Sequence, residues 1–184
     1  MGKFEQRLEG GKTGENLVAT FFANKYGCHV QHINGRMVEG VGPSLITQSG
    51  IIRSPDLLLF GQAGMIGGPC WVEVKTKKRW NHYNGKFSTG IDQYDWVHYR
   101  AIEDVTGLPV WIACLHLGKP LEDGRATPSG LWVQSMAMLH HWQRLEPDYS
   151  PGIDRYFFTM DKLVKFSNLE PVLDELPPHE VIGG

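Results

Sequence analysis

The sequence predicts an α/β protein with a central mixed β-sheet flanked by helices. Three observations support this class. Apolar residues recur at helical spacing in two segments, 13–26 and 91–106. Runs of strand composition occupy residues 51–60, 70–77 and 110–117. The resulting order of helix, strands, helix and strand is typical of a sheet that carries helices on its faces.

Length and composition indicate one soluble domain. The chain has 184 residues, 41% of them hydrophobic and 21% charged, which excludes disorder, collagen-like repeats and coiled coil. We expect a single domain over residues 1–184, with a core at 13–117 and a C-terminal elaboration at 118–184. No apolar run approaches the roughly 18 residues of a membrane span, and the N-terminus lacks a signal peptide. The sequence therefore predicts a cytoplasmic protein without a membrane partner.

The first predicted element is a helix from Thr13 to Tyr26. Thr13 is a suitable N-cap, and Gly27 is a natural stop. In this interpretation Glu15 lies in the first turn, where the helix dipole favours a carboxylate. The apolar face consists of Leu17, Val18, Phe21 and Phe22.

Two strands are expected next, at 51–60 and 70–77, joined by a Gly-rich turn. A connection of this length and composition indicates antiparallel neighbours. In the second strand, side chains alternate between the two faces of the sheet. Trp71, Glu73 and Lys75 therefore share one face, whereas Val72 and Val74 share the other.

The remaining elements follow the same patterns. A helix is predicted over 91–106, ended by Gly107, and a buried strand over 110–117. Later strands are predicted at 130–134 and 155–160, with short helices between and after them. The predicted apolar side of the helix comprises Tyr94, Val97, Ala101, Ile102 and Val105.

Ser54-Pro55-Asp56 and Glu73-Val74-Lys75 carry the most informative chemistry. Two carboxylates on adjacent strands can share one hard divalent cation such as Mg²⁺. Lys75 points to the same face as Glu73, so its ammonium lies beside the metal. There it can orient or help to deprotonate a metal-bound water, or neutralise a phosphate.

These residues resemble the PD-(D/E)XK nuclease superfamily, whose signature is an acid after a proline, a hairpin-length gap, and acid-x-Lys. The match is Pro55-Asp56 followed by Glu73-Val74-Lys75. Glu15 matches a Glu that is common in the first helix, and Gln93 matches a Gln found in some branches. The resemblance covers residues 13–117 and implies a restriction-endonuclease-like fold.

The resemblance also implies roles for these residues. Asp56 and Glu73 would bind Mg²⁺ or Mn²⁺, with the backbone carbonyl of Val74 as a further ligand. Lys75 would activate the attacking water, and Glu15 would be an accessory ligand. Gln93 would belong to the same catalytic group. The region after Gly118 matches no subfamily motif, so substrate specificity is not implied.

A local basic patch follows the predicted site. The formal net charge of the chain is −2, but residues 70–88 carry five basic residues and one acid, a local balance of +4. Lys77, Lys78 and Arg79 suit a phosphate backbone, and Trp80 could stack on a base. A charged edge without function is the alternative interpretation of this segment.

The sequence thus predicts a Mg²⁺-dependent nuclease that hydrolyses DNA, of the kind found in phages and mobile elements in recombination, repair or restriction. One alternative is a Holliday-junction resolvase, which would need a dimer. A second is a catalytically silent DNA-binding module with the same fold, although Asp56, Glu73 and Lys75 are all present. A third is an α/β protein unrelated to nucleic acid. Endonuclease and exonuclease action, DNA and RNA, and the oligomeric state remain open at this point.

Overall fold

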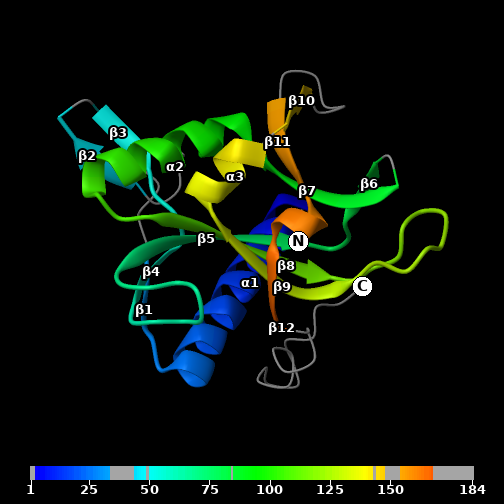
Figure 1. Ribbon diagram of the computed structural model, residues 1–184, viewed down its shortest axis with the longest axis horizontal. Coiled ribbons are helices and arrows are strands. Elements are labelled where there is room, and N and C mark those ends of the chain that lie inside the picture. The colour runs from blue at the N-terminus through cyan, green and yellow to red at the C-terminus, as the bar shows by residue number, and fades with distance from the viewer. Residues whose placement is uncertain are drawn as a thin grey trace.

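A six-stranded mixed sheet forms the centre of the molecule (Figure 1). The computed structural model describes residues 3–33, 44–48, 50–83, 85–142, 144–147 and 154–167. Across the central sheet the strands are β1 (His29–His32), β4 (Leu57–Phe60), β5 (Cys70–Lys77), β8 (Val110–Leu117), β9 (Ser129–Ser135) and β12 (Val164–Ser167). β5 and β8 run parallel, and every other neighbouring pair is antiparallel. The predicted α/β class with a mixed sheet is confirmed.

Smaller sheets lie beside the central one. A four-stranded sheet has the order β10 (Arg144–Pro147), β11 (Asp154–Thr159), β7 (Lys86–Asp92) and β6 (Asn81–Tyr83). β2 (Ser44–Thr47) and β3 (Gly50–Arg53) form a hairpin, and a short 3₁₀ helix, η1 (Met160–Lys162), precedes β12. Strands from after residue 117 therefore complete both larger sheets.

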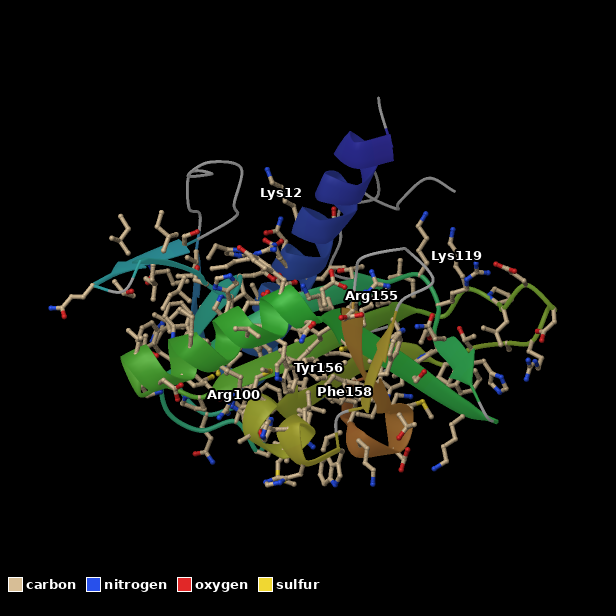
Figure 2. The ribbon with its side chains drawn as sticks, turned by 90° about the horizontal axis from the view of Figure 1, so that it is seen from above. Lys12, Arg100, Lys119, Arg155, Tyr156 and Phe158 are labelled. Carbon is tan, nitrogen blue, oxygen red and sulfur yellow. The ribbon has the colours of Figure 1, made fainter. Side chains whose placement is uncertain are left out.

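The helices cover the two faces of the central sheet (Figures 1 and 2). α1 (Lys3–Tyr26) packs on one face, and α2 (Gln93–Thr106) and α3 (Met136–Trp142) pack on the other. β8 is buried on both faces, because Ala113 and Leu115 join the α1 core while Ile112 and Cys114 join the α2 core. Within the described residues, no helix combines the length and apolar character that crossing a membrane requires.

α1 is longer than the sequence pattern predicted. It begins at Lys3, so Thr13 is an interior residue and not an N-cap. The segment EQRLE at positions 5–9 consists of good helix formers, which extends the helix through the glycines that follow. The predicted end is confirmed: Gly27 has φ 66°, and its N–H donates to the Ala23 carbonyl at 2.9 Å.

A glycine in α1 permits close contact with β5. A Cβ atom at Gly14 would lie 1.8 Å from Oγ1 and 3.0 Å from Cβ of Thr76. A side chain there would therefore push α1 away from the strand that carries Glu73 and Lys75. A Cβ at Gly11, one turn earlier, would meet nothing within 4 Å.

We therefore expect opposite effects from two alanine substitutions in this helix. Gly14→Ala should lower the free energy of unfolding by about 1 to 3 kcal/mol, the usual cost of overpacking. Gly11→Ala should raise it by up to about 1 kcal/mol, because alanine is the better helix former. Urea unfolding monitored by circular dichroism measures both. Equal effects of the two substitutions would contradict the close contact at Gly14.

The segment predicted as one strand, 51–60, is two strands. Among the described strands, β3 pairs only with β2, whereas β4 pairs with β1 and β5. The break occurs at Ser54-Pro55-Asp56, because proline lacks the N–H that a continuous ladder needs. In contrast, the strands predicted at 70–77 and 110–117 have these bounds in the structure.

The second helix also differs from its prediction. It begins at Gln93, because residues 86–92 form β7. Its buried residues are Asp95, Trp96, Tyr99 and Ile102, whereas Tyr94, Val97 and Val105 are more than half exposed. The large aromatic rings of Trp96 and Tyr99 bury more surface than the predicted stripe, and they determine which side faces the sheet. This orientation also points Asp95 and Tyr99 at β5.

Candidate active site

Asp56 lies where β4 begins to diverge from β5. The ladder between the two strands starts at Leu57, which pairs with Val72. One residue earlier, Oδ2 of Asp56 accepts a hydrogen bond from the Val74 N–H at 2.9 Å. The N–H and C=O of one strand residue point to the same edge, so the Val74 carbonyl also faces Asp56. The structure thus brings Asp56 against the middle of Glu73-Val74-Lys75.

Glu73 and Lys75 are adjacent on the face of β5 that packs against α2. Oε1 of Glu73 lies 2.6 Å from Nζ of Lys75. The Glu73 residue is only 3% exposed, and its second oxygen, Oε2, is buried without a hydrogen-bond partner among the described residues. Val72 and Val74 pack into the opposite core, against α1, so the predicted alternation is confirmed.

Two residues that the sequence pattern did not single out hold Lys75 in place. Asp95, on α2, accepts a hydrogen bond from Nζ of Lys75 at 2.7 Å through Oδ2. Its other oxygen, Oδ1, lies 2.8 Å from the guanidinium of Arg53, at the end of β3. The charges therefore alternate along a chain from Arg53 to Asp95, Lys75 and Glu73. The two flanking carboxylates raise the pKa of Lys75 despite its burial, so the ammonium is charged at neutral pH.

Tyr99 completes the wall formed by α2. It is fully buried, and its ring lies 5.9 Å from Nζ of Lys75. Burial and the nearby carboxylates of Glu73 and Asp95 hold the pKa of its phenol well above the usual range. Asp95 and Tyr99 are four residues apart, which places them on one helix face. That spacing was visible in the sequence, but the predicted apolar face lay on a different side of the helix.

Glu15 approaches the same group from α1. The contact of Gly14 with Thr76 places the next residue beside β5. The pKa of Glu15 is raised, first by burial and then by the negative charge of Glu73, while His32 and Lys12 oppose the shift. Glu15 therefore lies within electrostatic range of Glu73, although it is in the middle of α1 and not in a first turn as predicted.

Asp56 is the most strongly perturbed carboxyl of the site. Burial and the charges of Glu73 and Glu15 raise its pKa from 3.8 to about 9, against the opposing hydrogen bond from Val74. Between these two values, folded Asp56 retains a proton that the unfolded chain has lost. The folded state then binds more protons, so this group makes stability fall as pH rises through the window.

Asparagine at position 56 cannot ionise, yet its carbonyl can still accept the Val74 hydrogen bond. We expect Asp56→Asn to stabilise the protein in EDTA, and to do so by more at pH 8 than at pH 5.5. The stabilisation by Asp56→Asn at pH 8 should exceed that at pH 5.5 by more than about 1 kcal/mol. The reason is that wild type loses stability as pH rises through this range, whereas the variant lacks the titrating carboxyl. Urea midpoints at both pH values measure it, and parallel pH dependences of variant and wild type would contradict the raised pKa.

The site chemistry suits a hard divalent cation. Among the described residues, no three His, Cys, Asp or Glu side chains are arranged as a metal-binding group. Mg²⁺, however, typically takes one or two carboxylates and completes its shell with waters and substrate phosphate. Asp56, Glu73 and the Val74 carbonyl supply such a set, and Oε2 of Glu73 is a buried acceptor that makes no hydrogen bond of ordinary geometry among the described residues, with the Tyr99 phenol near its carboxylate. The residues therefore fit the metal that the sequence predicts.

Gln93 and the basic residues 77–79 lie at the edge of the candidate site, in different surroundings. Gln93 is the first residue of α2, and the α2 residues that contact Lys75 are Asp95 and Tyr99 instead. Lys78 and Arg79 are exposed, and Arg79 pairs with Glu122 at 2.8 Å. Lys77 is half-buried and lines a cavity. Roles for Gln93, Lys77, Lys78 and Arg79 stay predictions.

The prediction that Trp80 stacks on a base needs correction. Trp80 is 1% exposed, its ring is stacked on His116 with centroids 3.6 Å apart, and its Nε1–H donates to the Pro128 carbonyl at 2.8 Å. The strand direction placed it next to the basic residues, but the chain turns inward after Arg79. The indole ring and its polar edge are therefore used within the core.

Comparison with known proteins identifies the fold. No protein-family model and no curated protein matches the sequence. Among solved structures, the chain is similar to Hjc of Archaeoglobus fulgidus, a Holliday junction resolvase, with a TM-score of 0.50 and 11% identity over 84% of this chain and 95% of that one. It is also similar to D212, a nuclease from a fusselovirus, with a TM-score of 0.41 and 12% identity over 85% of this chain and 82% of that one. The likeness to Hjc confirms the predicted restriction-endonuclease-like fold.

Proposed function

We propose that this chain, which has the restriction-endonuclease-like fold, is a metal-dependent nuclease that hydrolyses phosphodiester bonds in DNA. One observation carries the proposal. Asp56 reaches the backbone of Val74 at 2.9 Å, and Glu73 contacts Lys75 at 2.6 Å, so two strands bring the three motif side chains together. Residues from two separate segments would have no reason to converge in this way if the motif were accidental.

Asp56, Glu73 and the Val74 carbonyl are the residues that would hold Mg²⁺ or Mn²⁺, with Glu15 as an accessory carboxylate. A bound divalent ion supplies Lewis-acid activation of the phosphodiester and of the attacking water. Neutralisation by the ion also accounts for three carboxylates crowded at one place, where the charge of Glu73 raises the pKa of both Asp56 and Glu15. The site residues thus suit a role that requires a cation between them.

Lys75 acts as a charged hydrogen-bond donor in this proposal. Its pKa is raised by Glu73 and Asp95, which favours the charged ammonium over the neutral amine that a general base requires. A fixed ammonium can instead orient the attacking water and offset the negative charge that develops on the phosphate. Asp95 and Arg53 are positioning residues, because they act on the substrate only through Lys75.

A panel of labelled substrates tests the function. Single-stranded, duplex, flapped and four-way DNA, together with RNA, are incubated with the protein in Mg²⁺, Mn²⁺ or EDTA. We expect cleavage of DNA in either metal and none in EDTA. Cleavage restricted to four-way DNA by a dimer would favour a junction resolvase, and binding without cleavage in both metals would favour the silent DNA-binding module. Cleavage of RNA alone would refute DNA as the substrate.

We also propose a biological context for the enzyme. DNA recombination, repair or processing in a phage or mobile element, in the cytoplasm, is the context that the motif resemblance favours. Size-exclusion chromatography with light scattering measures the oligomeric state, and the junction-resolvase alternative requires a dimer.

A further inference from the structure

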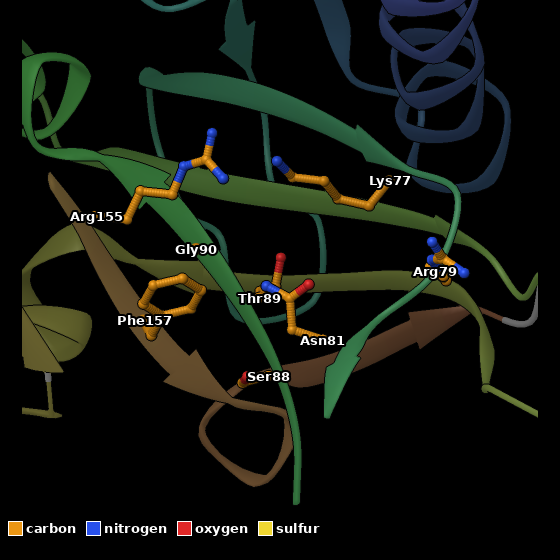
Figure 3. Close-up of a pocket in the computed structure, with 8 residues that line it drawn as sticks. All are labelled: Lys77, Arg79, Asn81, Ser88, Thr89, Gly90, Arg155 and Phe157. Carbon is orange, nitrogen blue, oxygen red and sulfur yellow. The ribbon is translucent and has the colours of Figure 1, made fainter. Parts of the chain in front are cut away.

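A small cavity lies between the end of β5 and the four-stranded sheet (Figure 3). Its volume is about 80 Å³. It begins close to the candidate active site, because Lys77 follows Lys75 by two residues and points to the same face of β5. The eight lining residues are Lys77, Arg79, Asn81, Ser88, Thr89, Gly90, Arg155 and Phe157.

The lining is cationic and rich in hydrogen-bond donors. Lys77 and Arg79 lie at the end of β5 and just after it, whereas Arg155 comes from β11, and in Figure 3 the side chains of Lys77 and Arg155 point toward one another. All eight lining residues are described in the structure, and none of them is acidic. Outside the lining, Asp92 holds the Arg155 guanidinium at 2.5 Å, which orients this side chain at the cavity. Arg79 likewise pairs with Glu122 at 2.8 Å, so Lys77 is the lining cation for which the described residues provide no ion pair, and an anion in the cavity would supply one.

A buried hydroxyl and a half-buried ammonium indicate that a ligand is expected there. Ser88 is 2% exposed, and its Oγ has no hydrogen-bond partner among the described residues. A buried hydroxyl without a partner is costly, and in native proteins it calls for an explanation. Burial, together with the nearby charges of Lys75 and Arg155, lowers the pKa of Lys77. Both groups would gain from an acceptor oxygen that carries negative charge.

The size of the cavity limits what this acceptor can be. Pockets for drug-sized ligands have volumes of about 300 Å³ or more, so a cavity of about 80 Å³ is too small for a nucleoside. A tetrahedral phosphate group is compact, and arginine, lysine and hydroxyl groups are its usual partners. The cavity therefore fits a phosphate group and not a base.

We propose that this cavity binds one phosphate group of a nucleic acid strand, near the phosphodiester bond that lies at Glu73 and Lys75. The inference rests on the proposed function, since it assigns the cavity to the same substrate. It differs from the linear basic patch 77–79, because Arg155 and Ser88 come from distant strands and Lys78 does not line the cavity. The phosphate is either internal to the strand or at its end.

Two substitutions test the cavity in ways that separate binding from folding. Lys77→Met removes a half-buried cation and retains the side-chain length, so the fold should be as stable as wild type or more stable. Ser88→Ala removes one unpartnered oxygen and should also leave stability equal or higher. Lys119→Met is the matched control, because Lys119 is exposed and lies outside the lining.

Inorganic phosphate is the first probe, used in EDTA so that metal plays no part. It should raise the melting temperature of wild type and of Lys119→Met, with at least half of this rise lost in Lys77→Met and in Ser88→Ala. Duplex DNA in EDTA is the second probe. Lys77→Met should weaken binding about 5-fold to 20-fold and reduce the salt slope by about 0.9, the value for one phosphate contact. The control should retain the wild-type affinity to within about 2-fold.

Substrates with a 5′-phosphate or a 5′-hydroxyl identify the source of the phosphate. If Lys77→Met weakens the binding of both substrates equally, the cavity holds an internal phosphate. If Lys77→Met removes only the preference for the 5′-phosphorylated substrate, the cavity holds a terminal phosphate. Wild-type phosphate and DNA binding in both Lys77→Met and Ser88→Ala would overturn the proposal. If wild type binds through the cavity but cleaves no substrate, the nuclease function fails while the phosphate site stands.

Discussion

Glu73→Gln is expected to abolish DNA cleavage while the fold is retained. Glutamine has nearly the same shape, but it removes the negative charge and replaces one oxygen with a donor. Oε1 of Glu73 is already used by Lys75, and Oε2 is the buried acceptor without a partner among the described residues. The loss should be at least about 10³-fold in kcat/KM, or roughly 4 kcal/mol of transition-state stabilisation. Cleavage of labelled duplex DNA in Mg²⁺ and in Mn²⁺ measures it.

Asp104→Asn provides a matched control for this experiment. Asp104 is exposed on α2, so this variant removes one negative charge outside the site. It should cleave as wild type does. Circular dichroism of the Glu73 variant confirms the fold, and cleavage at a rate near that of wild type would show that Glu73 does not belong to the catalytic group.

Lys75→Met is expected to have the second largest effect, and it should act on turnover and stability together. Turnover should fall by about 10² to 10³-fold, because the charged donor that faces the phosphate is removed. Stability should fall by about 3 to 5 kcal/mol, since Glu73 and Asp95 remain buried after losing their shared cation. Mg²⁺ affinity should be unchanged or slightly higher, because a positive charge beside a cation site is gone.

Calorimetry of Mg²⁺ binding separates the role of Lys75 from that of the carboxylates. Glu73→Gln should weaken Mg²⁺ binding, whereas Lys75→Met should not. Lys75→Arg retains the charge and should recover most of the stability but little of the turnover, because the guanidinium is larger and planar. Loss of metal binding in Lys75→Met would contradict the assignment of this residue to the substrate.

Parts of the fold could be predicted because their signals are local. β8 is an apolar run between Pro109 and Gly118, β5 alternates in character after Gly68-Pro69, and both have the predicted bounds. Alternation along β5 correctly placed Glu73 and Lys75 on one face, since the period of a strand is independent of its neighbours. The predicted start of α1 was wrong, because Thr13 has the chemistry of an N-cap but the residues before it also favour a helix.

The site was only partly visible in the sequence. Asp56, Glu73 and Lys75 form a motif with defined spacing, and β4 and β5 bring them together. Arg53, Asp95 and Tyr99 escaped detection, because each is an ordinary residue until α2 packs against β3 and β5. Trp80 was assigned to the surface by its basic neighbours, although packing against His116 buries it.

The sequence by itself determined the strand pair that carries the carboxylates, the face on which Lys75 lies and the α/β class, since residue spacing and alternation depend only on neighbours along the chain. Tertiary structure decided which partners Lys75 has and which residues line the cavity beside β5. The ion pairs of Lys75 bring together Arg53 and Asp95 from different elements. The cavity likewise brings together Lys77, Ser88 and Arg155. Their electrostatics arise from burial and from contacts between distant segments, and neither is a property of any local pattern.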